Sequence, residues 1–173
     1  RNVTVEPVAL CEHDGTAYFD VEDRNANSHL SDVPISHARS EVRERTEVQV
    51  AALDTVRERL DLRPDVIKID VEGAEEQVLA GLDLSRIRPW ILLIEATRPN
   101  STESIHEVWE LALLASGYLF AYTDGINRYY VANEHARLRG RLAFGPNILD
   151  NFVRSEQVWF ERPPFPTTIA RRP

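Results

Sequence analysis

The stretch that decides the fold is PDVIKIDVEGAEEQVLAG, residues 64–81. An apolar run leads directly into Asp70, Glu72 follows two residues later, and after a glycine two more acidic residues open a helical pattern. The run predicts a buried strand over 66–71, and the apolar spacing that follows predicts a helix over 75–82. Carboxylates at the end of a buried strand cost free energy unless they bind something, so this junction is a candidate functional site.

The same design occurs a second time at residues 90–95, where the apolar run WILLI leads directly into Glu95. Strands with continuous apolar runs that alternate with helices predict an α/β fold with a doubly wound, mostly parallel sheet. The other predicted elements are strands over 3–10, 16–21 and 47–50, helices over 53–60 and 105–115 (the second capped by Ser101), and a hairpin of 118–122 with 128–131. The first two strands are expected to form a hairpin, or a strand followed by a short edge strand, and the last pair adds an antiparallel edge.

The two strand-ending acids are expected to meet. Open sheets of this kind bind ligands at the carboxyl ends of their strands, and a right-handed crossover would make the two strands neighbours. Asp70 and Glu95 would then face one crevice, which Glu72 and Gly73 extend. Such a carboxylate pair can hold a divalent cation, act as a base toward a hydroxyl, or surround a sulfonium or ammonium centre, and the residues alone leave these alternatives open.

Three charged residues beside the junction have structural interpretations. Glu75 and Glu76 lie in the first turn of the predicted helix, where the helix dipole favours negative charge, so a capping role is preferred for both. Lys68 lies within the strand, and we expect it either to extend toward a sheet edge or to pair with an acid such as Glu72 or Glu95.

The composition limits the class of partner. The 173 residues fit one domain, expected over 1–153 and followed by a Pro-rich tail over 154–173. A net charge of −8 argues against nucleic-acid or anionic-membrane partners and favours a small-molecule substrate; a homo-oligomer is left open. The sequence has neither an apolar run of about 18 residues nor a signal-peptide pattern at its start. The single cysteine, Cys11, suits a reducing compartment, so a cytoplasmic location is expected.

The start of the chain predicts that it is incomplete. It begins within the strand-like run 3–10 and contains no methionine. We therefore expect this chain to be a fragment of a longer protein.

Several blocks of the chain together resemble one family. PDVIKIDVEGAEEQVLAG, preceded by VQVAALDTV and followed by RPWILLIEA, is similar to the signature of the FkbM-type methyltransferases. VEPVALCEHDG resembles the family's strand-and-turn element, NANSHL its Ser/Asn-rich loop and GINRYYVA its closing hairpin. The resemblance covers about residues 3–153.

The resemblance implies a class I methyltransferase fold and an activity. S-adenosylmethionine would be the cofactor, and the reaction would be O-methyl transfer to a hydroxyl of a sugar or a polyketide-like compound. Asp70 would be the base, or the ligand of a divalent metal that acidifies the hydroxyl. Glu72 or Glu95 would orient the substrate or complete the coordination of the metal. The implied cofactor-binding residues are Ala9, Leu10, Asp70 and Gly73.

The chain also departs from this family and leaves rival interpretations open. The family's first strand, its Gly-rich turn and the acid that ends its second strand are missing, which corresponds to about 60 residues before Arg1. We therefore expect this chain by itself to bind the cofactor poorly or not at all. The alternatives are a fragment of a nicotinamide-dependent oxidoreductase and a catalytically inactive Rossmann-like interaction module, with Trp109, Trp159 and Phe160 at an interface.

Overall fold

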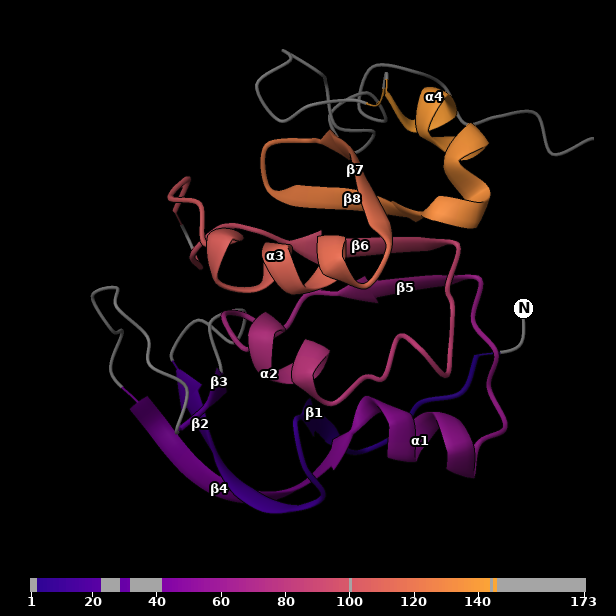
Figure 1. The fold of residues 1–173 in the computed structure, drawn as a ribbon. Helices are drawn as coiled ribbons and strands as arrows, with labels where there is room; N and C mark the ends of the chain where they lie inside the picture. The colour runs from indigo at the N-terminus through magenta and orange to yellow at the C-terminus, as the bar shows by residue number, and fades with distance from the viewer. Residues whose placement is uncertain (1–2, 23–28, 32–41, 100, 144, 146–173) are drawn as a thin grey trace, which may run out of the picture.

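The structure is a computed structural model that describes residues 3–22, 29–31, 42–99, 101–143 and 145 (Figure 1). Most of the predicted Ser/Asn-rich loop and all of the predicted Pro-rich tail, 154–173, lie outside these ranges. No helix among the described residues is long and apolar enough to cross a membrane.

The predicted elements occur in the predicted order, but the first strand covers residues 9–11 instead of 3–10, and a strand at 29–30 and two short helices after residue 132 were not predicted. The strands are β1 (Ala9–Cys11), β2 (Gly15–Glu22), β3 (His29–Leu30), β4 (Val42–Ala52), β5 (Val66–Ile69), β6 (Ile91–Glu95), β7 (Tyr118–Thr123) and β8 (Asn127–Ala132). The helices are α1 (Leu53–Arg59), α2 (Glu75–Ala80), α3 (Glu107–Ala115), the 3₁₀-helix η2 (Asn133–Leu138) and α4 (Arg139–Leu142).

The strands form two sheets, which we call sheet A, with the order β1-β4-β2-β3, and sheet B, with the order β5-β6-β8-β7. The mixed α/β class agrees with the prediction, but a doubly wound, mostly parallel sheet is not confirmed. Among the strands that the structure describes, the pairs β1–β4 and β5–β6 are parallel. β2 is antiparallel to both β4 and β3, and β8 is antiparallel to both β6 and β7. The reason in sheet A is the sequence of β4, VRERTEVQVAA, in which five consecutive charged or polar residues, 43–47, precede the alternating residues 47–50. A strand this polar cannot be covered on both faces, as a strand of a parallel sheet usually is.

The first two strands do not form a hairpin with each other. β1 and β2 lie on opposite sides of β4, so that Cys11 pairs with Ala52 and Gly15 pairs with Val50. The turn between them is held to the next helix instead. Asp14 accepts hydrogen bonds from the Ala52 N–H and the Thr55 hydroxyl, both at 2.9 Å.

The strand β5 is an edge strand, and this corrects the prediction that it is buried. Among the described residues its neighbour is β6 on one side, and no strand pairs with its other side. Exposure therefore alternates along it: Val66 is 55% exposed, whereas Ile69 is buried against the helices. The apolar run predicts two covered faces, but the structure covers one.

The main core lies between sheet B and the two helices α2 and α3, which cover one face of it (Figure 1). It contains Ile69, Val78, Leu82, Leu84, Ile87, Leu92, Ile94, Ala96, Trp109, Leu113, Tyr118, Tyr130 and Ala132. The buried Tyr118 hydroxyl donates to the Pro89 carbonyl at 2.8 Å, so its burial leaves no polar group unsatisfied. The closing hairpin is also fixed to α3, because Tyr130 and Arg128 both donate to Glu110, at 2.8 and 2.6 Å.

The C-terminal end of α2 contacts sheet A. A Cβ atom added to Gly81 would collide with the carbonyl oxygen of Cys11 and would lie 3.3 Å from the Ala52 Cα. The Gly81 carbonyl accepts a hydrogen bond from the Asp54 N–H at 3.1 Å. Only a glycine fits this close approach of two backbones.

Candidate active site at the strand ends

The parallel pairing of β5 and β6 brings the predicted acids together. Ile69 pairs with Ile94, so Asp70 and Glu95 follow at the same end of two neighbouring strands. Carboxylate oxygens of Asp70, Glu72 and Glu95 all lie within 4.8 Å of one another. The structure thus places all three predicted catalytic residues in one group, which we call the acidic cluster.

The backbone after Asp70 turns sharply to present Glu72 to this cluster. Glu72 has a φ of +54° and Gly73 a φ of +102°, both in the left-handed region that residues with side chains rarely adopt. Glu75 holds the turn in place, because its Oε1 accepts hydrogen bonds from the N–H groups of Val71 at 3.1 Å and Gly73 at 3.2 Å.

Glu75 has a larger role in the site than sequence reasoning gave it. It is only 1% exposed, and its second oxygen, Oε2, is buried without a hydrogen-bond partner. An acid in the first turn of a helix is usually a solvated charge near the dipole, so the sequence contained no signal for this burial. Glu76, the next residue, is exposed as a solvated helix residue should be.

Burial and mutual repulsion disturb the charges of the cluster. Burial is the largest cause that raises the pKa of Glu95 to about 8, and the neighbouring charges of Asp70, Glu72 and Glu75 raise it further. Burial also raises the pKa values of Glu72 and Glu75 above their ordinary range, more than any other cause.

Lys68 supplies a positive charge beside the acidic cluster. Its Nζ donates to Oδ2 of Asp70, and the two side chains are 51% and 39% exposed. The sequence predicted a pair with Glu72 or Glu95, whereas the structure selects Asp70. Because residues i and i+2 of an extended segment point to the same side, this partner follows from the strand geometry.

The predicted cofactor-binding residues separate into two groups. Leu10 and Asp70 line one cavity of about 190 Å³ beside the open edge of β5, together with Val71 and Val78. Ala9 and Gly73 are not among the residues that line it. Ala9 instead packs against the small core of sheet A.

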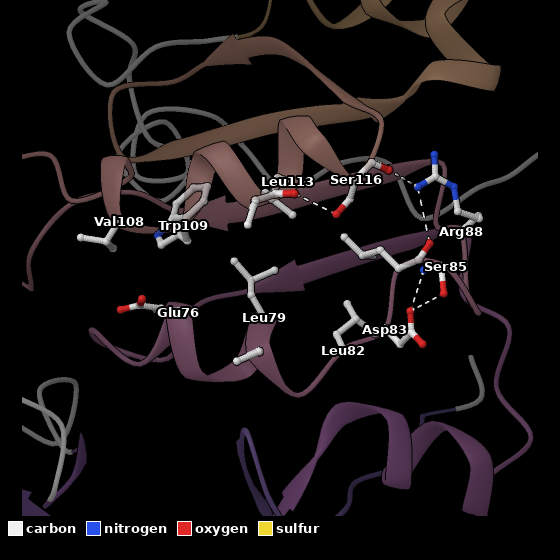
Figure 2. A pocket seen from close by; sticks show the side chains of 13 residues that line it. Glu76, Leu79, Leu82, Asp83, Ser85, Arg88, Val108, Trp109, Leu113 and Ser116 are labelled. Carbon is white, nitrogen blue, oxygen red and sulfur yellow. Dashed lines mark hydrogen bonds between the residues drawn. The ribbon is translucent and has the colours of Figure 1, made fainter.

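A larger groove of about 670 Å³ lies between α2 and α3 (Figure 2). Its walls are mostly apolar and include Leu79, Leu82, Trp109 and Leu113, with Glu76 at one end and Arg88 at the other. None of the three acidic-cluster residues lines it. The sequence analysis did not predict this groove, because the apolar residues of both helices were assigned to the core.

The fold and the cluster together define a class: an α/β protein with convergent carboxylates at the carboxyl ends of two parallel strands, where such sheets bind their ligands. Residues 2–120 match the family model described as the methyltransferase FkbM domain. The chain therefore belongs to the FkbM methyltransferase family, which confirms the predicted resemblance and makes methyl transfer the general class of activity. Comparison with curated proteins and with solved structures gave no significant match.

Proposed function

We propose that this chain carries the acceptor side of an S-adenosylmethionine-dependent O-methyltransferase active site, whose substrate is a hydroxyl of a sugar or a polyketide-like small molecule. The observation that supports this most directly is the acidic cluster. Asp70, Glu72 and Glu95 converge at the carboxyl ends of β5 and β6, inside the region that matches the FkbM family.

The chemistry requires a group that accepts a proton. Bound S-adenosylmethionine supplies an electrophilic methyl group on a sulfonium centre, and the acceptor oxygen must approach it in line. We assign the base to Asp70, which takes the proton of the hydroxyl as the oxygen–carbon bond forms. Lys68 donates to Oδ2 of Asp70 and so fixes the position of this carboxylate. Glu72 and Glu95 orient the acceptor by accepting hydrogen bonds from its other hydroxyl groups.

Part of the donor fits beside Leu10. The cavity that Leu10 and Asp70 line has apolar walls and ends at a carboxylate, which suits a ligand with an apolar part next to a cation. At about 190 Å³ it is smaller than the roughly 300–1,000 Å³ of ordinary ligand pockets. We therefore propose that this cavity holds only part of the donor. The buried, unpaired Cys11 is consistent with the reducing, cytoplasmic location that we also propose.

The test is the substitution Asp70→Asn in the natural full-length protein, assayed for methyl transfer to a panel of sugar and polyketide-like hydroxyl compounds. Loss of the base should lower kcat by roughly 100-fold or more, the range for general-base catalysis. Calorimetric binding of S-adenosylmethionine should persist in the variant and would show that the site is still folded.

Glu76→Gln is the matched control for Asp70→Asn. It also replaces a carboxylate by an amide in the same segment, but Glu76 is exposed and lies outside the acidic cluster. Its turnover should equal that of the unsubstituted protein. Normal turnover in Asp70→Asn would refute the assignment of the base. Binding of a nicotinamide dinucleotide in place of S-adenosylmethionine would refute the methyltransferase proposal itself.

A further inference from the structure

We propose that Asp70, Glu72 and Glu95 bind one divalent cation of the hard, oxygen-preferring class, for which Mg²⁺ and Mn²⁺ are the probes. The three ligands are also residues of the proposed methyl-transfer site, so this inference deepens the proposed function and rests on the same site, and its test measures cation binding directly. The first argument is geometric. Oxygens bound to one such cation lie within about two metal–oxygen bond lengths of each other, about 4–5 Å, and one oxygen from each of the three residues satisfies this limit.

The second argument is the orphaned oxygen of Glu75. This side chain is 1% exposed, and only its Oε1 is used, by the N–H groups of Val71 and Gly73. Its Oε2 is buried without a partner, and its charge acts on both Glu72 and Glu95. A buried carboxylate oxygen of this kind is costly unless a cation or a donor faces it. A water molecule on the bound cation would donate a hydrogen bond to Oε2.

The third argument is the local imbalance of charge. Four carboxylates, those of Asp70, Glu72, Glu75 and Glu95, influence one another's charges, while Lys68 contacts only Asp70 among them. One oxygen of Glu95, Oε2, is also buried without a hydrogen-bond partner. A divalent cation at the centre of the cluster would supply the missing positive charge. Ligands that are all carboxylate oxygens favour Mg²⁺, Mn²⁺ or Ca²⁺ over zinc or copper.

The experiment is a titration of the full-length protein with Mn²⁺, in which the loss of the free-ion paramagnetic resonance signal measures binding, followed by competition with Mg²⁺. We expect one Mn²⁺ per chain. Glu95→Gln should weaken binding by at least about tenfold, as should Glu75→Gln, which removes the acceptor of the metal-bound water. Glu76→Gln, the neighbouring exposed acid, should bind Mn²⁺ as the unsubstituted protein does.

A thermal unfolding series makes the result independent of any folding defect in the variants. Mn²⁺ should raise the Tm of the unsubstituted protein and of Glu76→Gln, because a ligand that binds only the folded state stabilises it. At the same Mn²⁺ concentration it should raise the Tm of Glu95→Gln by less. Absence of Mn²⁺ binding in the unsubstituted protein, or equal affinities in Glu95→Gln and Glu76→Gln, would overturn the metal site. Methyl transfer that persists in excess EDTA alongside such a result would leave the proposed function intact.

Discussion

Sheets A and B each contain one parallel pair and two antiparallel pairs of strands, yet they differ in the polarity of their strands and in the size of their buried cores. Sheet B has strands of continuous apolar residues, and its covered face packs against α2 and α3 in a core of thirteen buried residues. Sheet A has more polar strands, and among the described residues its core contains four buried residues, Cys11, Leu30, Val50 and Ala74. Stability is therefore concentrated in sheet B.

The acidic cluster lies at the end of the better-packed sheet. Its carboxylates repel one another and are partly desolvated, and such an arrangement persists only where the surrounding structure is rigid. Asp70 follows β5 and Glu95 ends β6, directly beside the main core. The packed core of sheet B therefore holds the acidic cluster in place, whereas sheet A contributes Leu10 to the lining of one cavity.

The largest predicted effect tests this difference in packing. Leu92→Ala in sheet B should lower the free energy of unfolding by about 2–5 kcal/mol, because Leu92 is fully buried at the centre of the main core. Val50→Ala, its counterpart in sheet A, should cost about 1 kcal/mol, near the average for point substitutions. Chemical denaturation measures both values. Equal costs at the two positions would show that the two cores are equally well packed and would break the comparison.

An intermediate effect is expected where the two sheets touch. Gly81→Ala should destabilise the protein by about 1–3 kcal/mol, because its Cβ would collide with the Cys11 carbonyl oxygen. The matched control is Gly140→Ala in α4, where no atom lies within 4 Å of the added Cβ. This control should be neutral or gain up to about 1 kcal/mol from helix propensity. Differential scanning calorimetry of both variants makes the comparison, and an unchanged Tm in Gly81→Ala would contradict the close contact.

The smallest effect concerns pH and is measured in EDTA. The pKa of Glu95 is about 8 in the folded protein and near 4.5 when unfolded, so folding disfavours its charged form. Stability should therefore fall as pH rises from about 4.5 to about 8. Glu95→Gln removes this loss: it should match the unsubstituted protein at pH 4 and exceed it by about 1 kcal/mol at pH 8, after allowance for solvent screening of a half-buried group.

Urea unfolding at a series of pH values tests this third prediction. Glu76→Gln is again the control and should run parallel to the unsubstituted protein at every pH. A difference between Glu95→Gln and the unsubstituted protein that is constant from pH 4 to pH 8 would show that Glu95 does not titrate as described.

Local patterns predicted most of sheet B and little of the pairing in sheet A. The strand β6, the helix α2 and the hairpin of β7 with β8 follow directly from apolar runs and turn residues. The partners of β1 and β2 could not be predicted, because both pair with β4, at least 20 residues later in the chain. Pairing at this distance depends on tertiary packing rather than on the turn between the strands.

The start of α3 was predicted too early for a similar reason. Ser101 resembles a helix N-cap, but the helix begins at Glu107. The intervening backbone returns to the sheet instead: the Ile105 N–H donates to the Ala96 carbonyl at 2.8 Å, and the Arg98 N–H donates to the Glu103 carbonyl at 2.9 Å. A short loop thus satisfied the hydrogen bonds that a helix would otherwise have made.

Asp70, Glu72 and Glu95 were correctly predicted to lie together, because strand ends and parallel pairing are both visible in the pattern. The burial of Glu75 was not predictable, since it depends on how the turn before α2 folds over its side chain. The periodicity of the sequence identifies which residues end a strand. It does not predict which of the two acids in the first turn of α2, Glu75 or Glu76, is buried.

The contact at Gly81 gives α2 a mechanical role. This helix, about 9 Å long, has the Glu75 end beneath the acidic cluster and the Gly81 end against the backbone of sheet A. At the Gly81 end no side chain separates the backbone of the helix from the backbone of sheet A. A displacement of β1 would therefore be expected to move α2 and the turn that holds Glu72, since Leu10 and Val71 also pack across the boundary between the two sheets.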